Sequence, residues 1–299
     1  MTRAGMPAGA RRAPTNDFAE AIAALVAARP PLLVVVDFDG TLAVGTRDPA
    51  AARIEPLARR ALRRLGGIAA ERPGRLHVAV LTGRIVADVA ARVRAGGVEY
   101  LGDHGLQHAS LARGGRAERL RPTTDTAFDV HRDPAEALAA GVAVELGAPP
   151  WLFVERKGPS VAFHVRQAED VTAARAAVVE AIAAVEQRLG LVHGLAHYRG
   201  RSVVDLRPRE AGGKREAVER LIQRHRPGGI VVLGDEVSDI DAFEAVISER
   251  SVDATLCGVT VAVRGGLRPA PPELLDRADL ALAGAHDVGR LLAALARRL

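Results

Sequence analysis

Two acidic residues follow an early apolar segment at a spacing that suits group-transfer chemistry. Residues 32–36 are Leu-Leu-Val-Val-Val, and Asp37 and Asp39 come directly after them, followed by Gly40 and Thr41. Ligands of open parallel sheets bind at the carboxyl ends of the strands, so the pair is expected at a binding edge. One carboxylate could attack as an anion while the other transfers protons, if their environments differ. Such a pair is also typical of strand-end turns, metal sites and response regulators.

Two more polar residues stand next to apolar or helical segments. Thr82 follows the apolar run 76–81, and its hydroxyl suits a hydrogen bond to a phosphoryl oxygen, although threonine there is also an ordinary helix N-cap. Lys214 starts a helical pattern after two glycines. A P-loop is excluded, because Pro208 stands where GxxxxGK needs a glycine and no core strand leads into the segment.

Acidic residues recur after a later apolar run. Residues 230–234 are followed by Asp235, Glu236 and Asp239. Carboxylates are the hard oxygen ligands that Mg²⁺ takes, and the alternative is a helix N-cap with acids in its first turn. Each of these four motifs is ordinary alone. Together, each at the end of a predicted strand or the start of the next helix, they indicate one shared site.

The apolar and helical patterns predict the elements that position these residues. Continuous apolar runs separated by helices are typical of a parallel sheet covered on both faces. The runs cover residues 32–36, 76–81, 98–101, 230–234 and 258–263, and helical patterns cover 54–66, 85–95, a segment from 239 and 286–298. We therefore predict an α/β fold in which both ends of the chain share one sheet.

The middle of the chain follows a different pattern. Paired alternating segments such as WLFVERKG and SVAFHVR, with helical patterns over 134–146 and 170–189, predict an α+β insert with an antiparallel sheet. The predicted division of the chain is a flexible tail over 1–15, a first core part over 16–107 that opens with a helix over 16–28, the insert over 108–208, and a second core part over 209–299.

The charge pattern argues against a nucleic-acid partner. The formal charge is +5, from 41 Lys and Arg against 36 Asp and Glu, but the arginines are scattered and aromatic residues make up 3% of the chain. Only Lys157 and Lys214 are lysines, and both fall at motif positions. A compact ammonium is a point charge that the planar guanidinium of arginine does not replace in a confined pocket.

The remaining composition predicts a cytoplasmic protein with no membrane partner. The single cysteine, Cys257, cannot form an internal disulfide, and its apolar neighbours predict a buried strand residue in a reduced compartment. No apolar run approaches the roughly 20 residues that cross a bilayer. The arginine-rich, acid-poor start leaves an organellar transit peptide as the alternative.

Taken together, the four motifs resemble those of the haloacid-dehalogenase-like (HAD) phosphatases. They are DFDGTL at 37–42, LTGR at 81–84, the isolated Lys214, and GDEVSD at 234–239. The resemblance covers the whole predicted sheet domain. It implies a HAD-like Rossmannoid core, with the α+β insert as its cap domain.

The resemblance also implies catalytic roles. Asp37 would be the nucleophile, Asp39 the general acid and then base, and Thr82 and Lys214 would hold the phosphoryl oxygens. Phosphoryl transfer needs in-line positioning and neutralised oxygens, which Mg²⁺ and a lysine supply. The implied Mg²⁺ ligands are Asp37, Asp39 through its carbonyl, Asp235 and Asp239.

Further segments resemble the trehalose-6-phosphate phosphatase family. They are GDHGL at 102–106, the cap pairs ERK at 155–157 and HVR at 164–166, and GDEVSDIDAF at 234–243. The resemblance implies Mg²⁺-dependent hydrolysis of trehalose 6-phosphate through an aspartyl-phosphate, and functional coupling to a trehalose-6-phosphate synthase. The implied substrate-binding residues are Arg84, Asp103, His104, Glu155, Lys157, His164 and Arg166.

Strand geometry supports convergence of the cap residues. Glu155 and Lys157 lie two apart and share one face of a strand, as do His164 and Arg166. If the two strands pair as a hairpin through residues 158–159, the four groups converge. The alternative is the solvent face of the cap sheet, carrying cross-strand charge pairs.

Some positions depart from the family pattern. The family reads GDDxTDExAF, and Glu236, Ser238 and Ile240 replace three of its residues, while Asp103 stands where Asn is more usual. The departures leave two alternatives. One is a phosphatase for another sugar phosphate, such as a sucrose, mannosylglycerate or hexose phosphate. The other is a catalytically silent regulatory partner of a sugar-phosphate synthase, which predicts a broken motif, and none of the four motifs is broken.

Overall fold

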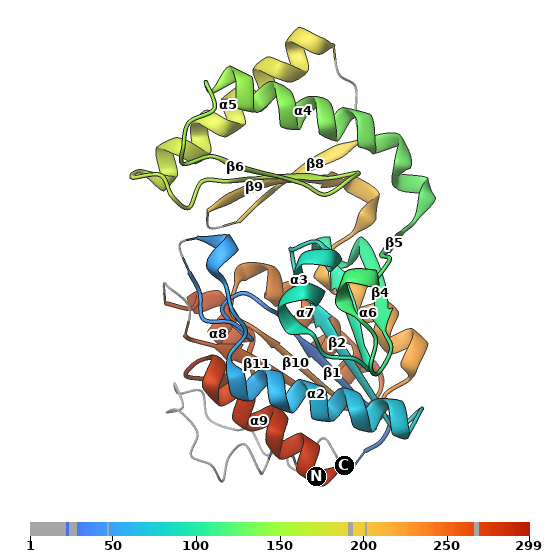
Figure 1. The fold of residues 1–299 in the computed structure, drawn as a ribbon. Coiled ribbons are helices and arrows are strands. Elements are labelled where there is room, and N and C mark those ends of the chain that lie inside the picture. The colour runs from blue at the N-terminus through green and yellow to red at the C-terminus, as the bar shows by residue number, and fades with distance from the viewer. Residues whose placement is uncertain (1–21, 24–28, 47, 191–193, 201, 266–268) are drawn as a thin grey trace.

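The computed structural model describes residues 22–23, 29–46, 48–190, 194–200, 202–265 and 269–299, which form two stacked parts (Figure 1). The lower part is a large sheet with helices on both faces, and the upper part is a smaller sheet with helices on its outer face. The predicted tail over 1–15 and most of the predicted helix over 16–28 lie outside the described residues.

The large sheet is parallel over six strands and antiparallel at one edge. Its strand order is β12-β11-β10-β1-β2-β3-β4-β5, and β4 and β5 run antiparallel to their neighbours. The strands are β1 (Leu32–Val36), β2 (Leu76–Leu81), β3 (Val98–Gly102), β4 (Gln107–Leu111), β5 (Thr123–Thr124), β10 (Gly229–Gly234), β11 (Cys257–Val263) and β12 (Leu280–Leu282). The predicted α/β class and parallel strands are confirmed.

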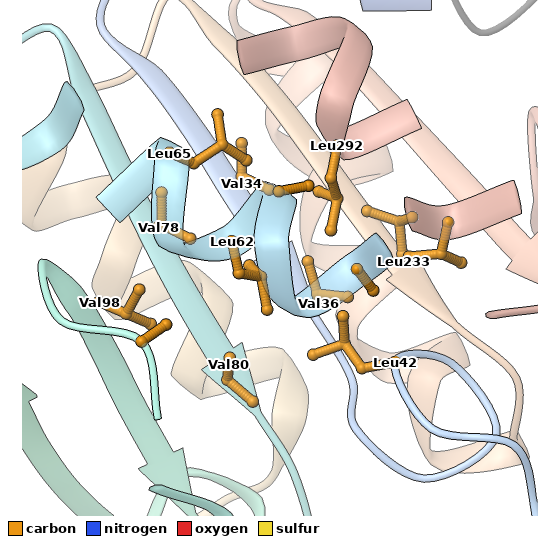
Figure 2. Close-up of a cluster of buried hydrophobic side chains, with 14 of the residues drawn as sticks. Val34, Val36, Leu42, Leu62, Leu65, Val78, Val80, Val98, Leu233 and Leu292 are labelled. Atoms are coloured by element: carbon orange, nitrogen blue, oxygen red, sulfur yellow. The ribbon is translucent and has the colours of Figure 1, made fainter. Parts of the chain in front are cut away.

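Alternate residues of β1 pack on opposite faces of this sheet, which explains its unbroken apolar sequence. Val34 and Val36 join a buried cluster with helices on one face (Figure 2), and Leu33 and Val35 join the cluster on the other. The first face carries α2 (Pro56–Glu71), α3 (Val86–Val93) and α9 (Ala285–Arg298), and the second carries α6 (Lys214–His225), α7 (Val237–Val252) and α8 (Pro272–Arg277).

Helix α2 shows how the local sequence sets these elements. The Glu55 carboxylate accepts the backbone N–H of Ala58 at 2.7 Å, and a proline opens the first turn. Ala58, Leu62 and Leu65 then recur every three or four residues and are fully buried. The helix therefore begins at a cap and presents one apolar stripe to the sheet.

The strand order reverses at β1, and this places the site. The chain runs from β1 to β2 and β3 on one side, then returns to β10 on the other side of β1. A crevice opens outside the carboxyl ends of the strands at such a switch point. The residues that follow β1, β2 and β10 therefore meet at one place.

The upper part is an antiparallel sheet of order β6-β7-β9-β8, which we call the cap. Its elements are α4 (Arg132–Glu145), β6 (Phe153–Arg156), β7 (Val161–His164), α5 (Val171–Leu189), β8 (Leu195–Arg199) and β9 (Val203–Pro208). Val161 and Phe163 pack among the helices, and the alternating His164 faces the large sheet, which Figure 1 shows below the cap. The predicted hairpin of β6 and β7 is confirmed.

The predicted start of the insert at 108 is wrong, because it falls inside β4. That strand pairs with β3 in the large sheet, and Ala109 and Leu111 join its buried cluster. The chain continues through β5 of the same sheet before it reaches α4. The cap sheet and its helices therefore begin after Thr124.

Two smaller expectations concern the burial of Cys257 and membrane-spanning segments. Cys257 is the first residue of β11 but only half-buried, because its strand starts at the rim of the sheet. Within the described part of the chain, no helix has the length and apolar character that crossing a bilayer requires.

Candidate active site

Three carboxylates meet at the carboxyl ends of β1 and β10. Ligand atoms of Asp37, Asp235 and Asp239 all lie within 4.8 Å of one another, and the three residues are buried. The Asp37 N–H donates to the Leu233 carbonyl at 3.0 Å, which ties the end of β1 to β10. Gly40 must lack a side chain, because its φ is +81° and a Cβ there would lie 2.0 Å from Asp235 Oδ2.

Lys214 joins two of these acids from the start of α6. Its Nζ lies 2.7 Å from Asp37 Oδ1 and 2.6 Å from Asp239 Oδ1, and the side chain is 3% exposed. The other oxygen of Asp239 accepts the backbone N–H groups of Asp235 and Glu236, at 2.9 and 3.0 Å. The helix-cap interpretation is therefore confirmed for Asp239, which also fixes the lysine, while a role of these acids as Mg²⁺ ligands stays a prediction.

The cluster carries excess negative charge. Burial raises the pKa of Asp37 well above its usual value, Asp239 raises it further, and Lys214 offsets part of the shift. Burial and the neighbouring Asp37 and Asp239 likewise raise the pKa of Asp235. One ammonium balances one of three carboxylates, so a divalent cation would balance the other two. An all-oxygen donor set fits Mg²⁺.

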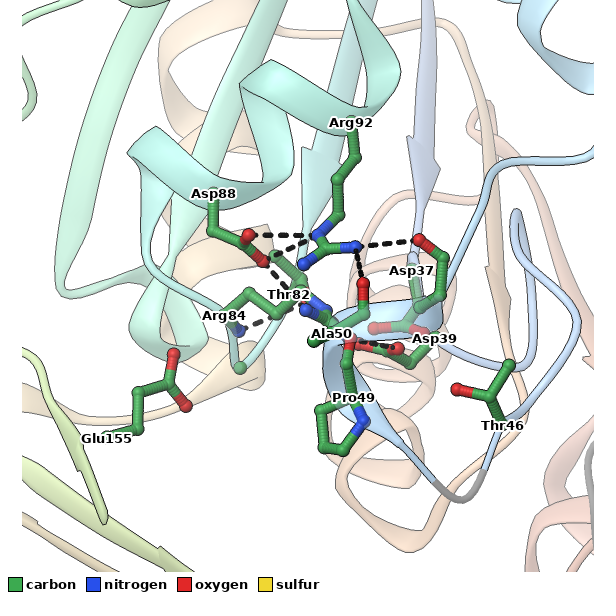
Figure 3. A network of polar contacts seen from close by, with 12 residues as sticks. Asp37, Asp39, Thr46, Pro49, Ala50, Thr82, Arg84, Asp88, Arg92 and Glu155 are labelled. Carbon is green, nitrogen blue, oxygen red and sulfur yellow. Dashed lines mark hydrogen bonds and ion pairs between the residues drawn. The ribbon is translucent and has the colours of Figure 1, made fainter. Parts of the chain in front are cut away.

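Asp39 is held by Arg84, as Figure 3 shows. Arg84 Nε lies 2.6 Å from Asp39 Oδ2 and its Nη2 lies 2.8 Å from Asp39 Oδ1, so both carboxylate oxygens are engaged. The third guanidinium nitrogen reaches Asp88 Oδ2 at 2.7 Å, and Asp88 also binds Arg92. Asp39 must leave this bidentate pair before it can exchange a proton with another group.

Thr82 follows β2 and lines the pocket beside these acids. Its Oγ1 accepts the N–H of Arg84 at 3.2 Å, and its carbonyl accepts the N–H of His104 at 2.9 Å. The N-cap of α3 is Ile85, so the interpretation of Thr82 as a helix cap is wrong. The hydroxyl stands at the strand end, as the sequence predicted.

A buried ion network joins the core to the cap. Lys157 Nζ lies 3.0 Å from the Gly83 carbonyl, 3.2 Å from Asp103 Oδ1 and 3.4 Å from Asp205 Oδ1, and its side chain is 2% exposed. Ser160 donates to the other oxygen of Asp103. Burial raises the pKa of Asp103, and Lys157 opposes that rise. Lys157 is thus engaged on every side by protein oxygens.

His104 lies in the same network and is kept neutral. Burial lowers the pKa of its imidazole to about 4, and Arg207 and Lys157 oppose protonation further, although Asp205 favours it. Its Nε2 lies 3.5 Å from Asp205 Oδ2. Asp103 and His104 both have positive φ, at 49° and 57°. Two consecutive non-glycine residues of this turn therefore adopt the left-handed backbone conformation.

The polar face of the cap closes the pocket from above. Glu155 Oε2 and His164 Nε2 lie 2.9 Å apart across β6 and β7, and Arg166 donates to the carbonyl of Thr46 in the core at 2.7 Å. The pocket between the two parts is about 320 Å³. The predicted site residues that line it are Asp37, Asp39, Thr82, Arg84, His104, Glu155, Lys157, His164, Arg166, Lys214 and Asp239. Asp103 and Asp235 lie outside this lining.

Comparison with known proteins places the chain in a family. The trehalose-phosphatase family model matches residues 35–266, a span that holds all the acids and both lysines described above. The chain belongs to the trehalose-phosphatase family. It is 38% identical over 219 residues to a trehalose-phosphate phosphatase of Mycobacterium avium (strain 104), an alignment that covers 71% of this chain and 51% of that protein. The chain therefore spans about half the length of that relative.

Two solved structures share the fold of this chain. The C-terminal domain of a C. albicans trehalose-6-phosphate phosphatase matches with a TM-score of 0.71 and 19% identity, covering 95% of this chain and 97% of that one. The C-terminal domain of a Candida albicans trehalose synthase regulatory protein matches with a TM-score of 0.63 and 13% identity, covering 95% and 100%. Because a phosphatase domain and a regulatory-protein domain share this fold, the fold alone does not separate an enzyme from a regulatory protein.

Sequence reasoning missed several residues that this trehalose-phosphatase family member brings to its site. Asp88 and Arg92 line the pocket with Arg84, and their spacing of four along α3 was a visible signal. The only sequence signal for Asp205 was its position in the alternating pattern of its strand. Away from the site, Glu99 lies 2.7 Å from His225 Nε2, and the rings of His77 and His225 stack with centroids 3.8 Å apart, although their sequence spacing indicates no ligand set.

Proposed function

We propose that this chain is a Mg²⁺-dependent phosphatase that hydrolyses trehalose 6-phosphate to trehalose and inorganic phosphate through an aspartyl-phosphate. The observation that carries the proposal is the intact cluster at the switch point, where Lys214 joins Asp37 to Asp239 beside Asp235. A nucleophile, a cation for the phosphoryl oxygens and a set of oxygen ligands for a divalent ion would thus lie together at one edge of the sheet.

The metal would be held by oxygens that the chain already places together. Asp37, Asp235 and Asp239, with the carbonyl of Asp39, are the proposed ligands. When bound, Mg²⁺ neutralises charge on the phosphoryl oxygens that would otherwise repel the incoming carboxylate. Lys214 keeps its hold on Asp37 and orients that carboxylate for in-line attack.

The proposed reaction has two steps on the chain's own residues. An oxygen of Asp37 forms a bond to phosphorus while the bond to the sugar oxygen breaks, and protonated Asp39 donates its proton to that oxygen. Water then attacks phosphorus, Asp39 accepts its proton, and the bond to Asp37 breaks to release phosphate. Arg84 must release Asp39 for either transfer, because it holds both carboxylate oxygens.

The cap residues supply the sugar-binding part of the proposal. Glu155, His164 and Arg166 line the pocket across from the acids, and hydroxyl groups of a disaccharide suit such donors and acceptors. Lys157 is proposed to act at the sugar by exchanging one of its three protein oxygen partners for a sugar oxygen. Arg84, Asp103 and His104 shape the edge of the same space.

Cellular context belongs to the proposal as well. A cytoplasmic location is supported by a single half-buried cysteine and by described helices too short or too polar to cross a bilayer. Functional coupling to a trehalose-6-phosphate synthase follows from the substrate, which a glycosyl transfer to a sugar phosphate must supply.

A panel of phosphate esters tests the proposal. Phosphate release is measured from trehalose, sucrose, mannosylglycerate and glucose phosphates, with and without Mg²⁺. We expect the highest kcat/KM for trehalose 6-phosphate, and activity that disappears with a chelator and returns with Mg²⁺. A preference for another sugar would overturn the substrate. Absence of turnover on every ester would favour the regulatory protein instead.

A further inference from the structure

A second pocket lies behind the catalytic one and is lined by arginines. Its volume is about 300 Å³, and Arg53, Arg59, Arg92 and Arg94 surround it with three alanines. It lies between α2, α3 and the short 3₁₀ turn Pro49–Ala51. Ala50 and Arg92 line both this pocket and the catalytic one, so a single wall separates them.

The positive charge of this pocket is largely uncompensated. Arg92 pairs with Asp88 at 2.9 Å, but Arg53, Arg59 and Arg94 form no ion pair with any residue that the structure describes. Arg59 donates to the Arg92 carbonyl at 3.2 Å, and its buried Nε has no hydrogen-bond partner. A buried guanidinium N–H without an acceptor costs free energy that a bound anion would recover.

The electrostatics of Arg59 agree with this geometry. Burial lowers the pKa of its guanidinium, and repulsion from Arg63 and Arg94 lowers it further. Arg63 itself donates to the carbonyl of Arg94 at 3.0 Å, which holds the two segments together without adding an acid. Arginine's fork suits phosphoryl oxygens better than a single carboxylate, because several planar donors converge on one tetrahedral group.

We propose that this arginine pocket is a second anion site, which binds the phosphate group of an inorganic phosphate or a small phosphate ester. The site is separate from the phosphatase centre. Its ligands come from α2, from α3 and its C-terminal turn, and from the segment before α2.

Binding of this anion would affect the catalytic centre through a short chain of ion pairs. Arg92 Nε contacts both oxygens of Asp88 at 2.9 Å, Asp88 binds Arg84, and Arg84 binds Asp39. An anion that binds Arg92 in place of Asp88 frees the Asp88 carboxylate to pair with Arg84 alone. The stronger pairing of Arg84 with Asp88 then weakens the hydrogen bonds from Arg84 to Asp39. Occupancy therefore activates turnover. This coupling rests on the proposed function, whereas binding does not.

Calorimetry without divalent metal tests the binding. Inorganic phosphate and glycerol 3-phosphate are titrated separately in EDTA, where the uncompensated acids of the catalytic centre repel anions. The wild-type protein is compared with Arg59→Gln/Arg94→Gln and with a matched control, Arg60→Gln/Arg64→Gln, which removes the same charge from exposed positions of α2. Circular dichroism confirms that each variant is folded.

We expect the pocket variant to bind at least about tenfold more weakly than the wild type, and the control to bind within about twofold. Stronger binding of inorganic phosphate than of glycerol 3-phosphate identifies an inorganic occupant, and the reverse order identifies an ester. Equal affinities of the pocket variant and the wild type, or no binding by the wild type, would overturn the site.

Kinetics at fixed free Mg²⁺ then test the coupling. The tighter-binding anion should raise the kcat of the wild type and of the control, about twofold or more, and leave the kcat of the pocket variant unchanged. Competition at the catalytic centre alone raises KM without raising kcat, and that result would overturn the coupling. Absence of turnover both with and without the added anion, with binding intact, would count against the proposed function only.

Discussion

The strand-end cluster of the core and the polar face of the cap hold charge in different ways. In the core, Lys214 is 3% exposed and is fixed by two carboxylates, one of which accepts two backbone N–H groups. In the cap, Glu155 and His164 are 17% and 19% exposed and bind chiefly each other. In the proposed reaction the core would therefore present fixed charge to a phosphoryl group, and the cap would present groups that exchange partners with a sugar.

Removing the nucleophile should produce the largest effect. Asp37→Asn cannot form an acyl phosphate, so we expect phosphate release to fall by at least about 10⁴-fold. Stability should hold or rise, because the variant removes a buried carboxylate whose pKa burial already raises. Phosphate release and thermal unfolding measure the two effects. Asp133→Asn, the same change at an exposed cap position, serves as the control. Turnover by Asp37→Asn above one percent of wild type would contradict the mechanism.

Removing the ammonium tests whether the core depends on fixed charge. Lys214→Met leaves Asp37 and Asp239 buried without a cation, so we expect a loss of about 3 kcal/mol or more in unfolding free energy without metal. We also expect about a 10³-fold lower kcat/KM. Chemical denaturation and phosphate release measure these changes.

The neighbouring residue provides the matched control for that experiment. Arg215→Met removes an exposed cation that pairs with Glu219, and it should cost no more than about 1 kcal/mol. If both variants lose the same stability, the buried ammonium does not hold the core cluster, and the contrast between core and cap fails.

This contrast also explains what could be predicted from the sequence. Asp37, Thr82 and Asp235 follow parallel strands, and the carboxyl ends of neighbouring parallel strands meet at one edge. Their convergence therefore follows once the strands are recognised. Asp239 lies in the first turn of the helix after β10, so the same reasoning reaches it. Lys214 opens α6, which follows the cap strand β9, so strand order alone does not place Lys214 at this edge.

Other contacts depend on packing that sequence does not display. Lys157 pairs with Asp205 at a separation of 48 residues, and no local pattern links them. β4 is five residues long and alternates buried with exposed positions, so it resembles a cap strand until its pairing with β3 is known. Arg84 was assigned to the substrate, although its spacing of four residues to Asp88 already indicated an ion pair at the start of α3.

The buried ion network between core and cap predicts a pH dependence of the unfolding free energy, and its size is intermediate among the predicted effects. The pKa of His104 is about 4 in the folded protein, below the ordinary value of 6.5, so the unfolded chain binds the proton more tightly. The stability that neutral His104 contributes is therefore complete above pH 6.5 and is lost as the pH falls toward 4. Between pH 8 and pH 5 the loss should be about 2 kcal/mol.

A variant isolates this contribution from the other acids. His104→Asn keeps a residue that tolerates the positive φ at this position. We expect the unfolding free energy of the wild type, measured relative to that variant by urea denaturation, to decrease by that amount from pH 8 to pH 5. A difference that stays constant with pH would show that His104 is not held neutral.

The smallest effect should come from the cap, and it decides whether the cap face binds sugar. Glu155→Gln keeps the shape but loses the charge that holds His164, so we expect KM for trehalose 6-phosphate to rise about tenfold while kcat changes less than about threefold. Glu136→Gln removes an exposed cap carboxylate that pairs with Arg156, and it should change neither constant. Steady-state kinetics with trehalose 6-phosphate and with p-nitrophenyl phosphate measure both. A KM that rises equally for the ester without a sugar would assign Glu155 to the phosphoryl group, and the division of labour between core and cap would then be wrong.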